Sequence, residues 1–341
     1  MRYRIAFSSV LVCAALAACG ESPSGGSTPT GPTSSKSVAV PTARLLATLQ
    51  SAQGSTIGPG GALFVTEPKA RRIVRIDPQT GAATTFASGL PYGDEAIVGL
   101  GSGAVDVAFI GGTAYVLVTG VDPEVGGSAV NGIYRIDSPT SYTVIADIGA
   151  WSKANPPATP WDALSGFQYA LETFRGGFLV TDGHHNRVLQ VSRDGVITQL
   201  IQFTDIVPTG LDVRGNTIYL AQAGPAPHLP ENGKVVTFGP GSTTATQIAA
   251  GAPLLVDVEF GRGRSLYALS QGIWTGTIPG DPASPNTGSL LRVNGDGTFT
   301  TVYSGLDRPT SVEIVGTTAY VVSLTGQIWV IDNIGGPPFG H

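Results

Sequence analysis

The sequence predicts an all-β fold, a six-bladed β-propeller of four-stranded antiparallel blades, and three observations support this. The 341 residues include 47 Gly and 25 Pro, so turns must be frequent. Only 13% of residues are charged, and the apolar residues alternate as they do in strands, with no helical stretch between them. One order of short motifs recurs six times along the chain, which is typical of a fold built from repeated units.

Two anchor positions define each repeat. The first is an aromatic residue or Leu in the middle of an apolar strand, and the second is a usually polar position, often Arg, on the next strand. The first anchors are Phe64, Tyr115, Leu179, Tyr219, Tyr267 and Tyr320, and the second are Arg75, Arg135, Gln190, Thr237, Arg292 and Val330. A β-sandwich is the alternative, but a sandwich gives no reason for six copies of one motif order.

The last repeat lacks a fourth strand, because only a Gly/Pro-rich segment follows residues 328–332. Residues 40–50 precede the first repeat and have no place in it. We therefore expect this N-terminal strand to close the last blade, which joins the chain ends and removes an exposed sheet edge.

Residues 1–18 form an export signal, with Arg2 and Arg4 before an apolar run that is too short to span a bilayer. The segment Leu16-Ala17-Ala18-Cys19 resembles a bacterial lipobox, which implies that Cys19 is acylated and anchors the chain to a lipid bilayer. Cleavage beside Cys19 without lipidation is the alternative. Residues 19–37 then comprise the lipidated Cys and a Ser/Thr/Gly/Pro-rich tether, and residues 38–341 the propeller domain. Gly20, not Asp, follows Cys19, and the resemblance to Gram-negative lipoproteins then implies sorting to the outer membrane. We therefore expect the protein in the cell envelope, at the outer membrane, facing the periplasm or the surface.

Residues 178–191, Phe-Leu-Val-Thr-Asp-Gly-His-His-Asn-Arg-Val-Leu-Gln-Val, resemble an NHL-type propeller repeat. From about residue 45 to 333 the chain is also similar to the narrower ScyD/ScyE family of exported propellers. The segments that carry this resemblance are Val207-Pro-Thr-Gly-Leu-Asp, Ala146-Asp-Ile-Gly-Ala-Trp with its following Asn-Pro, Ser304-Gly-Leu-Asp-Arg-Pro-Thr and Gly233-Lys-Val-Val. The resemblance implies the fold and carries over no catalytic residue. Where that family has a small residue at the start of the first strand, this chain has Asp106 in blade 2 and Asp257 in blade 5.

Five long insertions fall in the connections from second to third strands and between blades, and such connections all lie on one face of a propeller. Two of these insertions contain tryptophans, Trp151 and Trp161 in one and Trp274 in the other, which either contact a ligand or fix the long loops to the propeller. At the same face we expect Glu67, Asp106, Asp182, Gln222 and Asp257 to converge near the channel mouth. Such a ring suits Ca²⁺, with Asp106 and Asp257 as the metal candidates, or a polyhydroxylated ligand. The alternative is that each side chain caps backbone amides, especially Asp182 in its turn.

The net charge of −5 excludes a nucleic-acid partner held by phosphate contacts. The four His show no zinc spacing, and no nucleophile elbow, P-loop or dinucleotide motif occurs. We therefore expect a monomeric, lipid-anchored extracytoplasmic module that binds a small molecule or a protein through the insertion-rich face. The alternative is an enzyme, resembling either calcium-dependent lactonases or quinoprotein sugar dehydrogenases, and fold alone does not decide between them.

Overall fold

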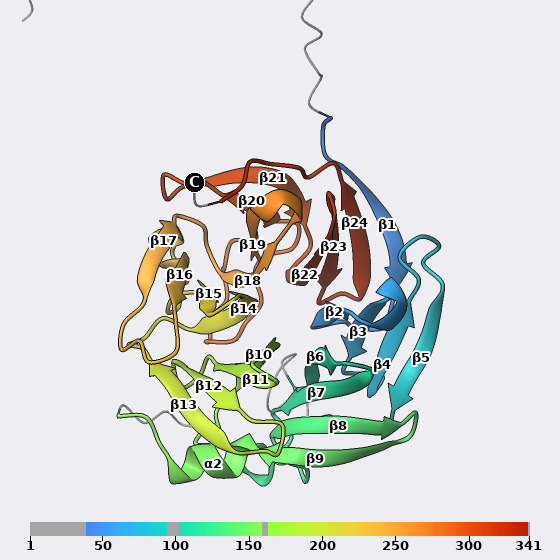
Figure 1. Cartoon of the computed structure of the whole chain (residues 1–341), viewed down its shortest axis with the longest axis vertical. Helices are drawn as coiled ribbons and strands as arrows, with labels where there is room; N and C mark the ends of the chain where they lie inside the picture. Colours follow the sequence, from blue (N-terminus) through green and yellow to red (C-terminus); the bar gives the residue numbers. More distant parts are fainter. Residues whose placement is uncertain (1–38, 94–101, 159–162, 340–341) are drawn as a thin grey trace, which may run out of the picture. The chain divides into compact units, whose positions relative to one another are not determined.

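The computed structural model describes residues 39–93, 102–158 and 163–339, and these form six four-stranded antiparallel sheets arranged in a ring (Figure 1). Each sheet is one blade, with its first strand at the centre of the ring and its fourth at the rim. The predicted six-bladed β-propeller is confirmed.

The strands of the first three blades are β2 (Ser55–Ile57), β3 (Leu63–Glu67), β4 (Arg72–Ile76) and β5 (Ala83–Ser88); β6 (Gly103–Ile110), β7 (Thr113–Thr119), β8 (Gly132–Ser138) and β9 (Ser141–Asp147); and β10 (Gln168–Phe174), β11 (Gly177–Asp182), β12 (Arg187–Val191) and β13 (Ile197–Gln202). Those of the last three are β14 (Pro208–Arg214), β15 (Thr217–Gln222), β16 (Lys234–Phe238) and β17 (Thr246–Ala250); β18 (Leu255–Phe260), β19 (Leu266–Ser270), β20 (Gly288–Val293) and β21 (Phe299–Leu306); and β22 (Pro309–Val315), β23 (Thr318–Ser323), β24 (Gln327–Asp332) and β1 (Thr42–Thr48).

The two sequence anchors of each blade lie opposite each other on its second and third strands. Phe64 pairs with Arg75 in blade 1, Tyr115 with Arg135 in blade 2, and the same register holds in the other four blades. Each sequence repeat therefore corresponds to one blade, with its two anchor positions in the same register throughout.

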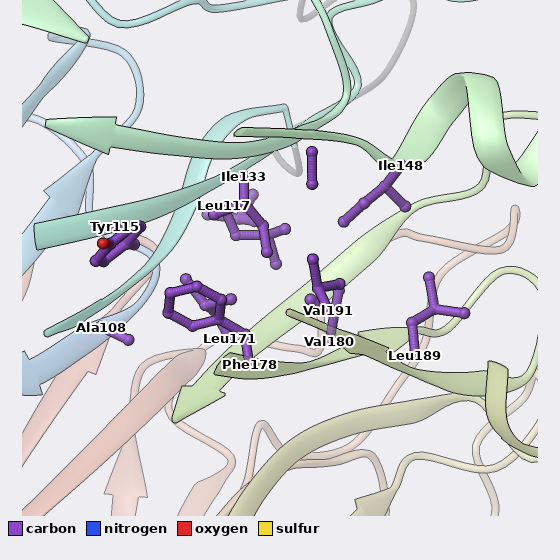
Figure 2. Close-up of a cluster of buried hydrophobic side chains, with 12 residues drawn as sticks. Ala108, Tyr115, Leu117, Ile133, Ile148, Leu171, Phe178, Val180, Leu189 and Val191 are labelled. Carbon is purple, nitrogen blue, oxygen red and sulfur yellow. The ribbon is translucent and has the colours of Figure 1, made fainter. Parts of the chain in front are cut away.

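The hydrophobic core is divided among the junctions between blades. Six apolar clusters in the described residues each join two neighbouring blades, because successive side chains of a strand point to opposite faces of its sheet. On β11, Phe178 and Val180 pack against blade 2, whereas Leu179 packs against blade 4. Figure 2 shows the junction between blades 2 and 3, where Tyr115 and Leu117 of blade 2 lie opposite Phe178 and Val180.

The N-terminal strand closes the ring as predicted. β1 pairs with β24, with Ala43 opposite Ile331 and Leu45 opposite Trp329. Leu46 and Leu49 pack against the cluster between blades 6 and 1. Since β1 is antiparallel to β24 and its first residue pairs with Asp332, the chain enters the propeller where β24 ends.

The sequence predicted no helix between the strands, and this prediction is wrong for one connection. α2 (Ile148–Ala154) follows blade 2, and the Asp147 side chain caps it by accepting a hydrogen bond from the Ala150 N–H at 2.8 Å. The short 3₁₀ turns are η1 (Pro59–Gly61), η3 (Pro123–Val125), η4 (Pro230–Asn232) and η5 (Arg262–Arg264). No helix among the described residues is long and apolar enough to cross a membrane.

The connections define two faces. The turns from first to second and from third to fourth strands are short, and we call their side the turn face. The connections from second to third strands and between blades lie on the other side, the insertion face. It carries η3, η4 and α2, and the long segment between β19 and β20. Parts of two insertions, residues 94–101 and 159–162, lie outside the described residues.

Candidate functional site

The central channel is lined by carboxyl groups at two levels. The upper level, nearer the insertion face, holds Asp106 on β6 and Asp257 on β18. Because these strands belong to the second and fifth of six blades, β6 and β18 lie on opposite sides of the ring (Figure 1). Both side chains are partly exposed, so water reaches them in the channel.

Asp106 and Asp257 are held by the same contacts. The Oδ1 of Asp106 accepts the Val107 N–H at 2.8 Å, and its Oδ2 accepts the Leu171 N–H of blade 3 at 2.7 Å. Asp257 repeats this with the Val258 N–H at 2.9 Å and the Val312 N–H of blade 6 at 2.8 Å. Each carboxylate therefore joins its own inner strand to that of the next blade.

Local backbone and a neighbouring glycine make room for these two side chains. Both strands have a β-bulge beside the Asp, between Ala104 and Asp106 and between Leu255 and Asp257, which redirects side chains locally. A methyl group on Gly54 of blade 1 would lie 2.4 Å from the Asp106 Oδ1, and one on Gly210 of blade 4 would lie 2.2 Å from the Asp257 Oδ1. An Asp and the Gly of the blade before it thus form a pair. This pair occurs twice, on opposite sides of the ring.

The lower level lies two residues further along the inner strands, toward the turn face. It holds four carboxyl groups on consecutive blades, and these are Glu172, Asp212, Glu259 and Glu313. The Asp212 Oδ2 accepts the Phe260 N–H of blade 5 at 2.9 Å, and the Glu313 Oε2 accepts the Ile57 N–H of blade 1 at 3.3 Å. These groups also link neighbouring blades.

Burial and mutual repulsion keep protons on these acids at higher pH than usual. Desolvation is the main cause throughout, and it raises the pKa of Asp257 and of Glu172 to about 7. It raises the pKa of Asp106 well above its ordinary value, with the Asp257 and Glu172 charges adding to the effect. The pKa values of Glu259 and Glu313 are raised in the same way. The channel is therefore an acidic, crowded space that favours a bound proton or cation.

A metal ion needs several ligands within one small sphere, and the described part of the chain does not provide that. No group of three or more His, Cys, Asp or Glu side chains there is placed to hold a metal ion. The carboxyl groups are instead spread along the channel axis, and consecutive inward positions of a strand are about 6–7 Å apart.

Asp182, at the insertion-face end of β11, belongs to a buried network rather than to the channel wall. Its Oδ2 lies 2.9 Å from the His185 Nδ1 and accepts the Arg187 Nε–H at 3.1 Å. Arg187 is fully buried and donates to the Ser152 Oγ of α2 at 2.9 Å, while its guanidinium lies 4.9 Å from the centre of the Trp151 ring. In this network Trp151 and Asp182 attach the insertion after blade 2 to blade 3.

The other candidates at the ends of second strands are also buried. The Glu67 Oε1 accepts the Gln50 N–H at 2.6 Å, and its Oε2 pairs with the Arg72 Nε at 2.5 Å. Gln222 is buried at the end of β15, opposite Pro208. Trp274 donates from Nε1 to the Asp281 carbonyl at 2.9 Å, and its ring lies 5.7 Å from that of His228, so it packs within the insertions. Trp161 and Cys19 lie outside the described residues.

The four acids of the lower level were not among the site residues predicted from the sequence. A signal for them exists, because Pro208-Thr-Gly-Leu-Asp and Pro309-Thr-Ser-Val-Glu place an acid at the same point of two inner strands. Asp257-Val-Glu259 shows the two-residue spacing that puts both side chains on the channel face.

No protein-family model matches the chain, and no curated protein matches it. Solved structures do resemble it. A putative glucose dehydrogenase from Thermus thermophilus shares 17% identity over 85% of this chain and 99% of its own, with a TM-score of 0.59. A gluconolactonase from Xanthomonas campestris shares 12% identity over 85% and 89%, with a TM-score of 0.58. A virginiamycin B lyase from Staphylococcus aureus shares 14% identity over 86% and 99%, with a TM-score of 0.51. At such identities the likeness shows the six-bladed fold, and the ScyD/ScyE resemblance stays a prediction.

Proposed function

We propose that the chain is an exported, lipid-anchored propeller that binds a small ligand at the insertion-face mouth of its channel. The observation that carries the proposal is the pair Asp106 and Asp257. Two carboxylates on opposite inner strands line a water-accessible channel, and no Lys or Arg side chain among the described residues forms an ion pair with either. Each carboxylate accepts two backbone N–H groups but meets no cationic side chain, so negative charge confined in this space favours a bound proton, cation or further hydrogen-bond donor.

The chemistry of this pair favours an extended ligand with donor groups. Each Asp already accepts two backbone N–H groups, and the acids lie at two levels of the channel. A short organic dication or a polyhydroxylated molecule can meet several of them at once. Ca²⁺ remains the metal to test, as the sequence predicted.

Exposed apolar side chains on the insertion face support its role as a binding surface. Leu164, Leu229, Ile273 and Ile278 are 43–62% exposed, and they come from three different insertions. Exposed Leu and Ile side chains on one face of the propeller are suited to contact a ligand or a partner protein.

The position where the chain enters the propeller fits lipid anchoring. β1 begins at the turn face, beside Asp332, so a tether from Cys19 joins the side opposite the insertions. A lipid anchor at Cys19 would therefore leave the insertion face accessible.

Lipid anchoring is tested by mass spectrometry of the mature N-terminus from the native membrane. We expect a diacylated Cys19 as the first residue, and we expect Cys19→Ala to abolish processing and membrane retention. An unacylated N-terminus at another residue would overturn this part of the proposal.

Ligand binding is tested by calorimetry and thermal melting with pentane-1,5-diamine, glucose and Ca²⁺, each with an EDTA-treated reference. We expect the wild type to bind one of these probes, and Asp106→Asn with Asp257→Asn to weaken binding at least tenfold. Asp137→Asn is the matched control, because Asp137 is exposed and pairs with Arg135 on a blade surface. Identical melting of the wild type under all conditions would contradict a small-molecule site at this mouth.

The second candidate is an enzyme like those named for the similar structures, a lactonase or a PQQ-dependent sugar dehydrogenase. A quinoprotein site needs a histidine base and an arginine, but the His185 and Arg187 side chains are bonded to Asp182 in the network with α2. Hydrolysis of gluconolactone with Ca²⁺, or dye-linked oxidation of glucose with PQQ, would favour the enzyme over the binding module.

A further inference from the structure

A cavity of about 450 Å³ opens between blades 4 and 5 at the end of the channel opposite the insertions. Its lining comes from the ends of β14 and β18 and the turn that follows β18, and consists of Asp212, Val213, Arg214, Glu259, Phe260, Gly261, Gly263 and Arg264. Because inner strands run toward the turn face, this cavity opens there. It is separate from the insertion-face mouth at Asp106 and Asp257.

The inner wall of the cavity is acidic. The Asp212 Oδ1 accepts the Val213 N–H at 2.5 Å and its Oδ2 accepts the Phe260 N–H, which fixes the carboxylate in place. The carboxyl groups of Asp212 and Glu259 interact with each other. Burial raises the pKa of both, and the Asp212 charge adds to the effect on Glu259, so this wall favours a bound proton or cation.

The outer wall is basic. The Arg214 guanidinium lies 5.1 Å from the centre of the Phe260 ring, which holds it beside the opening. Arg264 lies in η5 with a positive φ of 75°, and its carbonyl accepts the Phe339 N–H at 2.8 Å, so the C-terminal segment fixes the turn. Within residues 39–93, 102–158 and 163–339, no hydrogen bond or ion pair engages the Arg264 guanidinium.

The two walls therefore present opposite charges at different depths. Asp212 and Arg214 are two residues apart on one strand, which separates their Cα atoms by about 6–7 Å. In an α-amino acid only the Cα separates the ammonium group from the carboxylate, so the two charges lie roughly 3 Å apart. Such a molecule is too short to reach both walls. A zwitterion with a chain of several methylene groups between its charges has the required length.

We propose that this cavity binds a small ω-amino acid, with its ammonium group on Asp212 and Glu259 and its carboxylate on Arg214 and Arg264. The Phe260 ring lines the same cavity, with the Arg214 guanidinium 5.1 Å from its centre, and supplies an apolar surface for the methylene chain. The inference does not depend on the ligand proposed for the insertion-face mouth.

The test uses three five-carbon compounds that differ only in their terminal charges: 5-aminopentanoate, pentane-1,5-diamine and pentanedioate. Calorimetric titration of the full chain should show that 5-aminopentanoate binds at least tenfold more tightly at this cavity than pentanedioate. Arg264→Ala should weaken 5-aminopentanoate binding at least tenfold and leave diamine binding unchanged, whereas Asp212→Asn should weaken 5-aminopentanoate binding.

Arg262→Ala is the matched control, because Arg262 belongs to the same turn and does not line the cavity. It should leave the affinity for 5-aminopentanoate unchanged. Asp106→Asn distinguishes the two sites, since Asp106 lies on blade 2, away from the cavity between blades 4 and 5. It should weaken binding of a ligand at the insertion-face mouth and leave 5-aminopentanoate affinity unaltered. Absence of 5-aminopentanoate binding, or an equal loss with Arg262→Ala and Arg264→Ala, would overturn the inference.

Discussion

The acidic channel predicts that the protein loses stability as the pH rises through neutrality. Asp257 and Glu172 have pKa values of about 7 in the folded chain, compared with 3.8 and 4.5 for exposed groups. At pH values between the pKa of the unfolded chain and that of the folded chain, the folded state holds protons that the unfolded chain has released. Linkage then requires the free energy of unfolding to fall with increasing pH from about 4 until the folded-state groups have titrated, near pH 7 to 8.

The loss of stability follows from how far each pKa is raised on folding. A carboxyl pKa raised by about three units corresponds to at most ~4 kcal/mol, at 1.36 kcal/mol per unit. Water reaches these partly exposed side chains, and screening reduces the contribution to roughly 1–2 kcal/mol for each group. Together, Asp257 and Glu172 should lower the melting temperature by about 5–10 °C between pH 5 and pH 8, given about 2–3 °C per kcal/mol for a domain of this size.

The assay is scanning calorimetry of the wild type and of the double variant Asp257→Asn with Glu172→Gln, in steps from pH 5 to pH 8.5. The double variant should show a clearly shallower decline. Asp137→Asn should keep the wild-type slope, because hydrogen bonds from Thr143 and Arg135 lower the pKa of Asp137, which titrates below this range. A double variant that declines as steeply as the wild type would refute the reasoning, because the slope would then come from other groups.

Three further predictions concern the framework. Deleting residues 39–50 removes β1 and leaves β24 as an exposed edge, so we expect melting to fall by about 5 °C or more and self-association to appear on gel filtration; melting within about 2 °C would contradict closure by this strand. Arg187→Met should lower the unfolding free energy in urea by about 3–5 kcal/mol, since it leaves Asp182 buried without its guanidinium partner, whereas the exposed Arg135→Met should change it by less than about 1 kcal/mol. Gly210→Ala should cost about 1–3 kcal/mol because its methyl group would overlap Asp257, while Gly112→Ala, with open space around it, serves as the control.

The sequence was sufficient for the framework because the framework depends on repetition. Phe64 and Arg75 pair in register because every blade must place an apolar strand beside the next one, and six copies make the pattern visible. The closing strand could be predicted by elimination, since the last repeat was one strand short. The helix α2 was missed because its seven residues depend on one capping side chain, Asp147, and show no helical periodicity of their own.

The site was less accessible to sequence reasoning. Asp106 and Asp257 stood out because they replace small residues, and both line the channel. Glu67 and Asp182 also carry carboxyl groups near the same face. Each of them, however, is paired with an arginine that lies five residues later in the chain. Sequence spacing alone does not reveal whether an acid at a strand end turns back to a nearby arginine or points into the channel. That choice depends on bulges and neighbouring glycines in three dimensions.

The channel acids have a structural role that does not depend on a ligand. Asp106, Asp212, Asp257 and Glu313 each accept a backbone N–H from the next blade, so they stabilise the junctions of inner strands whether or not a ligand is present. A neutral acceptor would make the same bond without crowding negative charge in the channel, so the junction alone gives no reason for a carboxylate. An amide variant retains the oxygen that accepts the N–H and loses the charge. If Asn at position 257 preserves the fold and flattens the decline of stability with pH, the carboxylate at that position has a role beyond the junction, and the acidic channel is the feature of this propeller that a ligand must match.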